Sequence, residues 1–256
     1  MTRKPELVTD PLFNVSGKTY LIAGAGGGLG SVMAKALYER GARLVLFDIN
    51  KTTLERVGAT LPDALTQVAD INAQAALTKM VQLAQNQFGK IDGAINAAGL
   101  LPMAPSATFD ETVFRQCIDV NLTAAFLFSR TVAEHMHDDG GRIVHIASVS
   151  SFVANPEYAA YASSKAGLAQ MIRVLAREWA PKNILVNAIG PALTETPLTH
   201  DYLANPDFRG NAISAIPMGR LGEADDLIGA LLLLLSPAGG FITGQTIYVD
   251  GGRTLV

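Results

Sequence analysis

The chain of 256 residues has little cysteine, little charge and no long apolar segment. Its single cysteine, Cys117, excludes an internal disulfide framework and suits a reducing cytoplasm. The longest apolar run, residues 227–235, is far shorter than the roughly 20 residues of a membrane-spanning helix, so we interpret it as a buried helix. The first 14 residues lack the apolar core of a signal peptide. We therefore expect a cytoplasmic protein with no membrane partner.

Charged residues make up only 17% of the chain, the net charge is −3, and no run of basic side chains occurs. A nucleic-acid-binding protein carries a basic patch, so we expect no nucleic-acid partner. The hydrophobic fraction of 49% is typical of a globular chain with a substantial core. No repeat or linker divides the sequence, and we expect one domain over residues 1–256.

Short apolar runs alternate with longer segments of helical periodicity, which predicts βα units and a parallel sheet. We expect strands at residues 19–23, 43–47, 65–69, 93–96, 142–147, 184–188 and 246–249. We expect helices at residues 29–40, 52–58, 72–88, 110–137, 158–180 and 223–235. The predicted fold is α/β: a single-domain Rossmann fold with a doubly wound seven-stranded parallel sheet and helices on both faces.

Residues 193–216 interrupt this alternation with Thr, Pro, Asn and scattered apolar residues. We interpret the segment as a lid that covers a substrate and orders when ligands bind. Within it, Arg209 is either a contact for an anionic substrate group or a solvated surface arginine.

A glycine-rich segment, AGAGGGLG from Ala23 to Gly30, joins the first predicted strand to the first predicted helix. Gly24, Gly28 and Gly30 would let the backbone turn tightly and approach a pyrophosphate, which the helix N-terminus stabilises. A glycine cluster alone could be a flexible loop. Its position between a strand and a helix favours dinucleotide binding.

Two carboxylates follow the next two predicted strands. Asp48 ends the second strand, where it could accept hydrogen bonds from the adenosine ribose of NAD and repel the 2′-phosphate of NADP, or cap a helix. Asp70 ends the third strand and could meet the adenine edge or cap the helix that follows. Because Ile49 and Gly27 offer no cation to bind a 2′-phosphate, we expect NAD as the cofactor.

Tyr161 and Lys165 are four positions apart in a predicted helix, so their side chains share one face. A nearby ammonium lowers the pKa of a phenol toward the range useful for acid–base catalysis. Ser148 follows a predicted strand and could hydrogen-bond a substrate oxygen beside the phenol. These groups could move a proton on or off an alcohol while a hydride leaves its carbon. A lone Tyr–Lys pair with this spacing is usually an ordinary surface pair, so the other motifs must decide whether this one is catalytic.

Together and in this order, these residues resemble the short-chain dehydrogenase/reductase family. The resemblance covers residues 17–252 and rests on segments 24–30, 96–99, 161–165, 187–191 and 244–251, with Asn121 and Ser148. It implies Tyr161 as general acid/base and Ser148 as the residue that orients the substrate oxygen. It also implies that Lys165 binds the nicotinamide ribose and lowers the Tyr161 pKa, and that Asn121 holds a relay water beyond Lys165.

The resemblance also implies wider cofactor and substrate sites. The expected cofactor-binding residues are Gly24, Gly27, Gly28, Leu29, Gly30, Asp48, Ile49, Asp70, Ile71, Asn96, Ala97, Ala98, Gly99, Tyr161, Lys165, Pro191, Ala192, Thr194 and Thr196. The expected substrate-binding residues are Ser148, Ser150, Tyr158, Tyr161, Leu198 and Tyr202. Relatives are usually tetramers that pack the helices predicted at 110–137 and 158–180, which implies a homotetramer.

We therefore expect an NAD-dependent oxidoreductase that interconverts a secondary alcohol and a ketone. Similarity to gluconate 5-dehydrogenase-like members favours a sugar, sugar acid or polyol as the small-molecule substrate. One alternative is a 3-oxoacyl-thioester reductase using NADPH, which Asp48 and Gly27 disfavour. Another is a non-catalytic dinucleotide sensor or scaffold, which would not need Ser148, Tyr161 and Lys165.

We expect no metal site. His135 and His137, beside Asp138 and Asp139, form the one cluster that suggests a metal. Two residues apart on a helix, the histidines would point away from each other, so we interpret the cluster as a solvated helix end.

Overall fold

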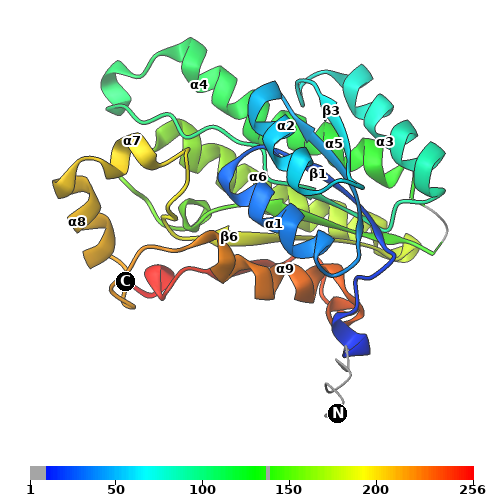
Figure 1. Ribbon diagram of the computed structural model, residues 1–256. Coiled ribbons are helices and arrows are strands. Elements are labelled where there is room, and N and C mark those ends of the chain that lie inside the picture. The colour runs from blue at the N-terminus through cyan, green and yellow to red at the C-terminus, as the bar shows by residue number, and fades with distance from the viewer. Residues whose placement is uncertain (1–9, 137–138) are drawn as a thin grey trace, which may run out of the picture.

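The computed structural model describes residues 10–136 and 139–256, and a seven-stranded parallel sheet forms its centre (Figure 1). The strands are β1 (Thr19–Ala23), β2 (Arg43–Asp48), β3 (Leu65–Val68), β4 (Gly93–Asn96), β5 (Gly141–Ile146), β6 (Ile184–Pro191) and β7 (Thr246–Val249). Their order is β3-β2-β1-β4-β5-β6-β7, so the direction of winding reverses between β1 and β4. The predicted Rossmann fold is confirmed, and all seven predicted strands are present.

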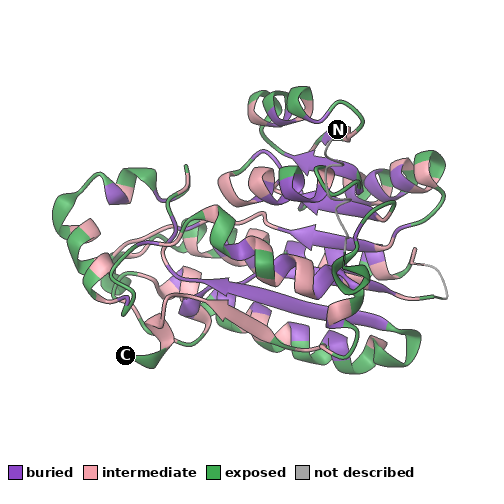
Figure 2. Cartoon of the chain, turned by 60° about the horizontal axis from the view of Figure 1, so that its bottom comes forward, coloured by how far each residue is buried: buried purple, intermediate pink, exposed green. Residues whose placement is uncertain are grey.

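Helices cover both faces of the sheet, as Figure 1 shows. On one face lie α1 (Gly28–Tyr38), α2 (Lys51–Thr60) and α9 (Ile228–Leu235), and on the other lie α3 (Gln74–Phe88), α5 (Ala124–Ala133) and α6 (Ala159–Trp179). Successive residues of β1 alternate between these two cores: Leu21 belongs to the core of α3, α5 and α6, and Ile22 to that of α1, α2 and α9. The inner strands are therefore buried on both sides, while edge strand β7 is only partly buried (Figure 2).

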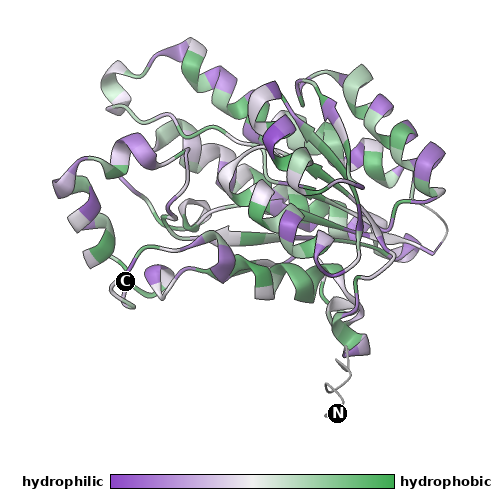
Figure 3. Ribbon diagram, viewed as in Figure 1, coloured by the Kyte–Doolittle hydropathy of each residue, from purple (hydrophilic) through white to green (hydrophobic). Residues whose placement is uncertain are grey.

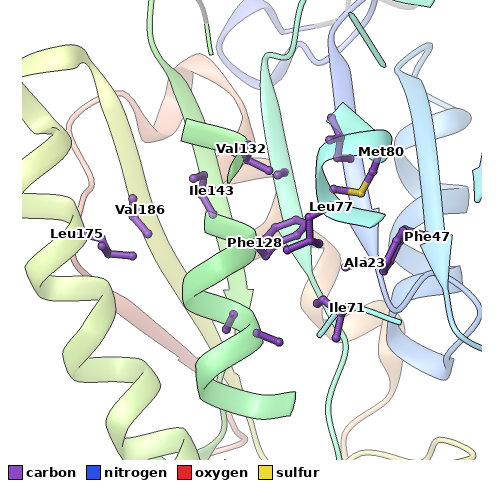
Figure 4. Close-up of a cluster of buried hydrophobic side chains, with 14 of the residues drawn as sticks. Ala23, Phe47, Ile71, Leu77, Met80, Phe128, Val132, Ile143, Leu175 and Val186 are labelled. Carbon is purple, nitrogen blue, oxygen red and sulfur yellow. The ribbon is translucent and has the colours of Figure 1, made fainter. Parts of the chain in front are cut away.

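The core under α3, α5 and α6 holds the strands against the helices (Figure 4). Phe128 of α5 and Phe47 of β2 are almost completely buried there, with Met80 of α3. Burying each such side chain contributes about 1.5–3 kcal/mol of transfer free energy. Polar residues lie on the outer helix faces (Figure 3). The strand ends, from which the site is built, are thus anchored from both sides.

The helix predicted at residues 110–137 is interrupted in the structure. α4 (Glu111–Ile118) continues into one π-helical turn at Asp119–Thr123, and α5 follows it. Asn121, in the π turn, exchanges two hydrogen bonds with the backbone of Leu100 at 2.8 and 2.9 Å. Such π turns occur mostly as single insertions within α-helices, frequently at functional sites.

The apolar run at residues 227–235 lies mostly in α9, and the prediction of a buried helix is correct: Leu231, Leu234 and Leu235 are buried. Within the described part of the chain, no helix combines the length and apolarity needed to cross a bilayer.

The segment 193–216 contains two helices that the sequence pattern did not predict, α7 (His200–Leu203) and α8 (Pro206–Ser214). α8 starts at Asn205, whose side chain accepts hydrogen bonds from the N–H groups of Asp207 and Phe208. Asn followed by Pro is a readable start signal, but these helices are short and α8 buries no residue. In Figure 1 both lie at one end of the molecule, beyond β6.

Candidate active site

A cleft of about 1700 Å³ lies at the carboxyl ends of the strands. This is the position at which doubly wound sheets bind ligands. The cleft brings together the glycine loop, the ends of β2 and β3, the first turns of α6 and the lid segment 193–216. Every predicted site residue lines it except Gly30, Asn96, Asn121 and Tyr202.

The glycine loop requires glycine for close packing. Gly24 has a φ of +74°, and a Cβ there would lie 2.5 Å from the backbone nitrogen of Ala98. A Cβ on Gly30 would lie 2.1 Å from the carbonyl oxygen of Gly24. Gly30 therefore packs against the backbone of the glycine loop and does not line the cleft.

The N-terminus of α1 is open toward the cleft. Its N-cap, Gly27, makes no side-chain hydrogen bond, and its first turn contains no acidic residue. Gly28 and Leu29 line the cleft at this point. Uncapped N–H groups at the positive end of a helix dipole bind phosphate oxygens well. The residues present therefore fit a dinucleotide.

Asp48 connects the glycine loop to the turn after β2. It is 9% exposed, and its carboxylate accepts hydrogen bonds from the N–H groups of Gly26 and Asn50, both at 2.8 Å. Asn50, not Asp48, caps α2, so the capping alternative for Asp48 is excluded. Each carboxylate oxygen can accept a second hydrogen bond, which leaves capacity for a ligand hydroxyl.

Asp70 shapes the turn that precedes α3. Its Oδ1 accepts hydrogen bonds from the backbone and side-chain N–H groups of Asn72, both at 2.9 Å. The N-cap of α3 is Ala73, so Asp70 is not the helix cap. Thr53 and Arg56 also line this end of the cleft, and sequence reasoning missed both. The two residues are three positions apart on the helix that follows Asp48, and this spacing could have identified them as lining the same site.

Ser148, Tyr161 and Lys165 meet in the cleft, as predicted. Ser148 follows β5, and its hydroxyl accepts a hydrogen bond from the N–H of Ser150 at 3.1 Å. Tyr161 and Lys165 occupy the first two turns of α6, and Lys165 Nζ lies 5.7 Å from the centroid of the Tyr161 ring. Nζ donates a hydrogen bond to the carbonyl of Ile146 at 2.6 Å.

Burial controls the protonation of both groups. It raises the pKa of Tyr161 to about 12, although hydrogen bonding by Ser148 counteracts part of the rise. Burial lowers the pKa of Lys165 to about 8. Desolvation of the phenol therefore dominates the pKa of Tyr161 in this structure, and the ammonium of Lys165 donates its hydrogen bond to Ile146. That Lys165 lowers the Tyr161 pKa stays a prediction.

Asn121 is buried and does not line the cleft. Besides its bonds to Leu100, its side-chain amide donates to the hydroxyl of Ser164 at 3.0 Å. It thereby ties the loop after β4 to α6, one position before Lys165. Asn96, also buried, accepts a hydrogen bond from the N–H of Ala98 at 3.1 Å and shapes the same loop.

The segment 193–216, which the sequence predicts to be a lid, contacts both the glycine loop and the loop after β4. Thr196 and Pro197 lie against Gly28, where a Cβ would come within 2.8 Å of each. At the other side, the hydroxyl of Tyr202 donates a hydrogen bond to the carbonyl of Leu101 at 2.9 Å. Tyr202 was predicted to contact substrate, but this bond directs its hydroxyl to the backbone and the residue does not line the cleft.

Arg209 lies outside the cleft. It forms an ion pair with Glu195 and lines a separate shallow depression on the lid. The structure therefore does not place Arg209 in the cleft, and a contact with an anionic substrate stays a prediction that it does not test.

The histidine cluster considered for a metal is only partly described. His135 Nδ1 hydrogen-bonds the carbonyl of Thr131 at 2.8 Å, while His137 and Asp138 lie outside the described residues. Among residues 10–136 and 139–256, no three His, Cys, Asp or Glu side chains are grouped to hold a metal ion.

The fold and cleft define a dinucleotide-dependent oxidoreductase of the doubly wound α/β class. A family model described as enoyl-(acyl carrier protein) reductase matches residues 24–254. The chain is 36% identical over 244 residues to 2-dehydro-3-deoxy-D-gluconate 5-dehydrogenase of Dickeya dadantii, covering 94% of this chain and 96% of that protein. The chain belongs to the short-chain dehydrogenase/reductase family.

Two further relatives differ in the cofactor that their names give. The chain is 33% identical to an NAD-dependent glycerol dehydrogenase of Listeria innocua, covering 96% of this chain and 97% of that protein. It is also similar to a gluconate 5-dehydrogenase from Burkholderia cenocepacia, whose crystal structure is a complex with NADP and tartrate. That similarity has a TM-score of 0.90 and 30% identity, and covers 96% of this chain and 98% of that one.

Proposed function

We propose that this protein is an NAD-dependent dehydrogenase that interconverts a secondary alcohol and a ketone on a sugar, sugar acid or polyol. The observation that carries the proposal is the meeting of Ser148, Tyr161 and Lys165 in the same cleft as an uncapped glycine-loop helix. The bound dinucleotide would accept or return the hydride, and the protein would supply orientation and the proton.

Tyr161 is the proposed acid/base. With a pKa of about 12 it is protonated at neutral pH, the state needed to donate a proton to a ketone oxygen. Alcohol oxidation needs the phenolate instead. High pH favours that form, and so does Lys165 at pH values where its ammonium is charged. Ser148, beside the phenol, would hydrogen-bond the same substrate oxygen, and Lys165 would reach the ribose of the cofactor.

We propose NAD because of the surroundings of Asp48. Its carboxylate forms no ion pair with any lysine or arginine in the described part of the chain. A 2′-phosphate brought beside it would meet like charge in a nearly buried position. The adjacent Ile49 is 68% exposed and offers no compensating cation.

The substrate class rests on the named relatives, which include enzymes of sugar acids and of glycerol. The test is reduction of NAD and NADP by the purified protein with polyols, sugar acids, hydroxyacyl thioesters and steroids. We expect turnover with NAD and a polyol or sugar acid. Turnover confined to hydroxyacyl thioesters, or to NADP, would contradict the proposal. Absence of turnover with every alcohol tested would favour a non-catalytic dinucleotide sensor.

We further propose a cytoplasmic homotetramer. Apolar side chains remain exposed on the helices that would pack between subunits: Val113 of α4 and Phe126 of α5 are each 39% exposed, and Val174 of α6 is 47% exposed. Light scattering during size-exclusion chromatography measures the mass directly, and a monomer at micromolar concentration would reject the tetramer.

A further inference from the structure

Arg253, near the C-terminal end of the chain, lines the same cleft as the proposed acid/base, and it was not among the site residues predicted from the sequence. Its Nη2 donates a hydrogen bond to Asn155 Oδ1 at 3.1 Å. Asn155 in turn lies 3.5 Å from the hydroxyl of Ser150, whose N–H donates to Ser148 Oγ. A chain of polar contacts thus connects the guanidinium to the residue that orients the substrate oxygen.

The turn after β7 places Arg253 in this position. Gly251 and Gly252 have φ angles of +58° and +89°, which other residues rarely adopt. The carboxylate of Asp250 accepts hydrogen bonds from Gly252 N–H at 3.0 Å and from Thr254 N–H at 2.8 Å, so the turn is closed by its own residues. In Figure 1 the C-terminal end lies next to α8.

The same turn also packs against the end of the lid. Met218 N–H donates to the carbonyl of Gly251 at 3.0 Å, and a Cβ on Gly251 would lie 2.7 Å from Ile216. The position of Arg253 is therefore determined jointly by the sheet edge and the lid.

No Asp or Glu side chain among the described residues forms an ion pair with Arg253. Its second hydrogen bond goes to the oxygen of Val256 at 3.1 Å. Arg115, another arginine that lines the cleft, is paired with Glu111. Glu157 also lines this end but forms no ion pair with Arg253. The two hydrogen bonds of Arg253 use only part of its guanidinium, which has five N–H donors.

We propose that Arg253 binds the carboxylate of the substrate and makes the enzyme selective for sugar acids over neutral polyols. The planar guanidinium matches a carboxylate with two parallel N–H···O bonds, and such charge-assisted pairs are roughly twice as strong as neutral hydrogen bonds. The proposal rests on the proposed dehydrogenase function and specifies its substrate class. The alternative is that Arg253 serves only to hold Asn155 and the C-terminal turn.

The test compares Arg253→Gln and Arg253→Lys with the unmodified enzyme on two substrates, gluconate and its neutral counterpart glucitol. Gln can still donate to Asn155, so the local structure should persist. We expect Arg253→Gln to raise KM for gluconate by about 10- to 100-fold, in line with the ~1.5–3 kcal/mol of a hydrogen bond to a charged group. KM for glucitol should change less than about twofold, and Lys should restore part of the gluconate affinity.

Arg40→Gln is the matched control, because it removes an exposed arginine just after α1 that neither lines the cleft nor belongs to the segment 193–216. It should leave both KM values unchanged. Equal losses on gluconate and glucitol in Arg253→Gln would show a purely structural role and overturn the proposal. Unchanged KM for gluconate would overturn it as well.

A binding measurement separates failure of this proposal from failure of the proposed function. Gluconate should raise the melting temperature of the wild-type protein saturated with NADH, glucitol should raise it less, and Arg253→Gln should abolish the difference. This readout does not require turnover. Stabilisation by gluconate that persists in Arg253→Gln, or that is absent from the wild type, overturns the role of Arg253 whether or not the enzyme oxidises alcohols.

Discussion

Lys165 and Tyr161 share one face of α6, with Lys165 Nζ 5.7 Å from the centroid of the Tyr161 ring. Burial shifts the two groups in opposite directions, raising the pKa of the phenol to about 12 and lowering that of the ammonium to about 8. Both shifts favour the neutral forms. Between these two pKa values both side chains are therefore neutral, and the contribution of the pair to the free energy of unfolding depends on pH.

The first prediction concerns stability and pH in Lys165→Met. The pKa of Lys165 falls from 10.5 in the unfolded chain to about 8 in the folded one, so between these values the unfolded state binds more protons. The free energy of unfolding of the wild type, relative to Lys165→Met, should therefore rise from pH 8 to pH 10.5, by at most roughly 1.4 kcal/mol per pH unit. Urea unfolding of both proteins without cofactor measures it, and a flat difference would contradict the shifted pKa.

The second prediction concerns Tyr161→Phe. This change keeps the ring and removes the proposed proton donor, so turnover should fall by about 10²–10⁴-fold. NAD binding, measured by fluorescence titration or calorimetry, should persist. The matched control is Tyr158→Phe, because Tyr158 also lines the cleft and packs edge-on against Tyr161 at 5.9 Å between centroids. It should alter KM or substrate preference, and near-normal turnover in Tyr161→Phe would reject the proposed acid/base.

The third prediction concerns the lid. Tyr202→Phe removes the hydrogen bond that joins α7 to Leu101, so residues 193–216 should be cut faster in limited proteolysis and KM should rise. Cofactor and substrate together should protect the wild-type segment. Tyr38→Phe is the control, since the Tyr38 hydroxyl contacts exposed Asp63 far from the lid. Equal cutting with and without ligands would show that ligands do not order the lid.

The fourth prediction concerns cofactor choice. Like charges about 4 Å apart repel by roughly 4 kcal/mol at the effective dielectric of a protein surface, which corresponds to a preference of several hundred-fold for NAD. The ratio of kcat/KM for the two cofactors measures it. A preference for NADP would reject the interpretation of Asp48.

Asp48→Ala combined with Ile49→Arg should erode or reverse that preference. Ile49 is the better site for the new arginine, because it is 68% exposed, whereas a Cβ on Gly27 would lie 3.2 Å from the carbonyl oxygen of Gly24. Arg56 lines the same end of the cleft, so Arg56→Ala shows whether it supports any residual use of NADP.

The sequence by itself determined the fold and most of the residues that line the candidate site. Alternating apolar runs and helical segments specify a parallel sheet, because each pattern buries its apolar face in only one kind of secondary structure. The glycine loop, Ser148, Tyr161 and Lys165 were readable because glycine geometry and helical spacing are local properties. The same locality left Asp48 and Asp70 ambiguous between a ligand contact and a cap.

Only the tertiary structure decided which groups face each other across distant segments. The contact of Arg253 with Asn155 spans 98 residues, and the bond of Tyr202 to Leu101 spans 101. The pKa of Tyr161 likewise depends on burial, which arises only when the surrounding chain packs around it, so the spacing of Tyr161 and Lys165 could not predict this rise. Long-range contact and desolvation are properties of the packed chain, and no local pattern encodes them.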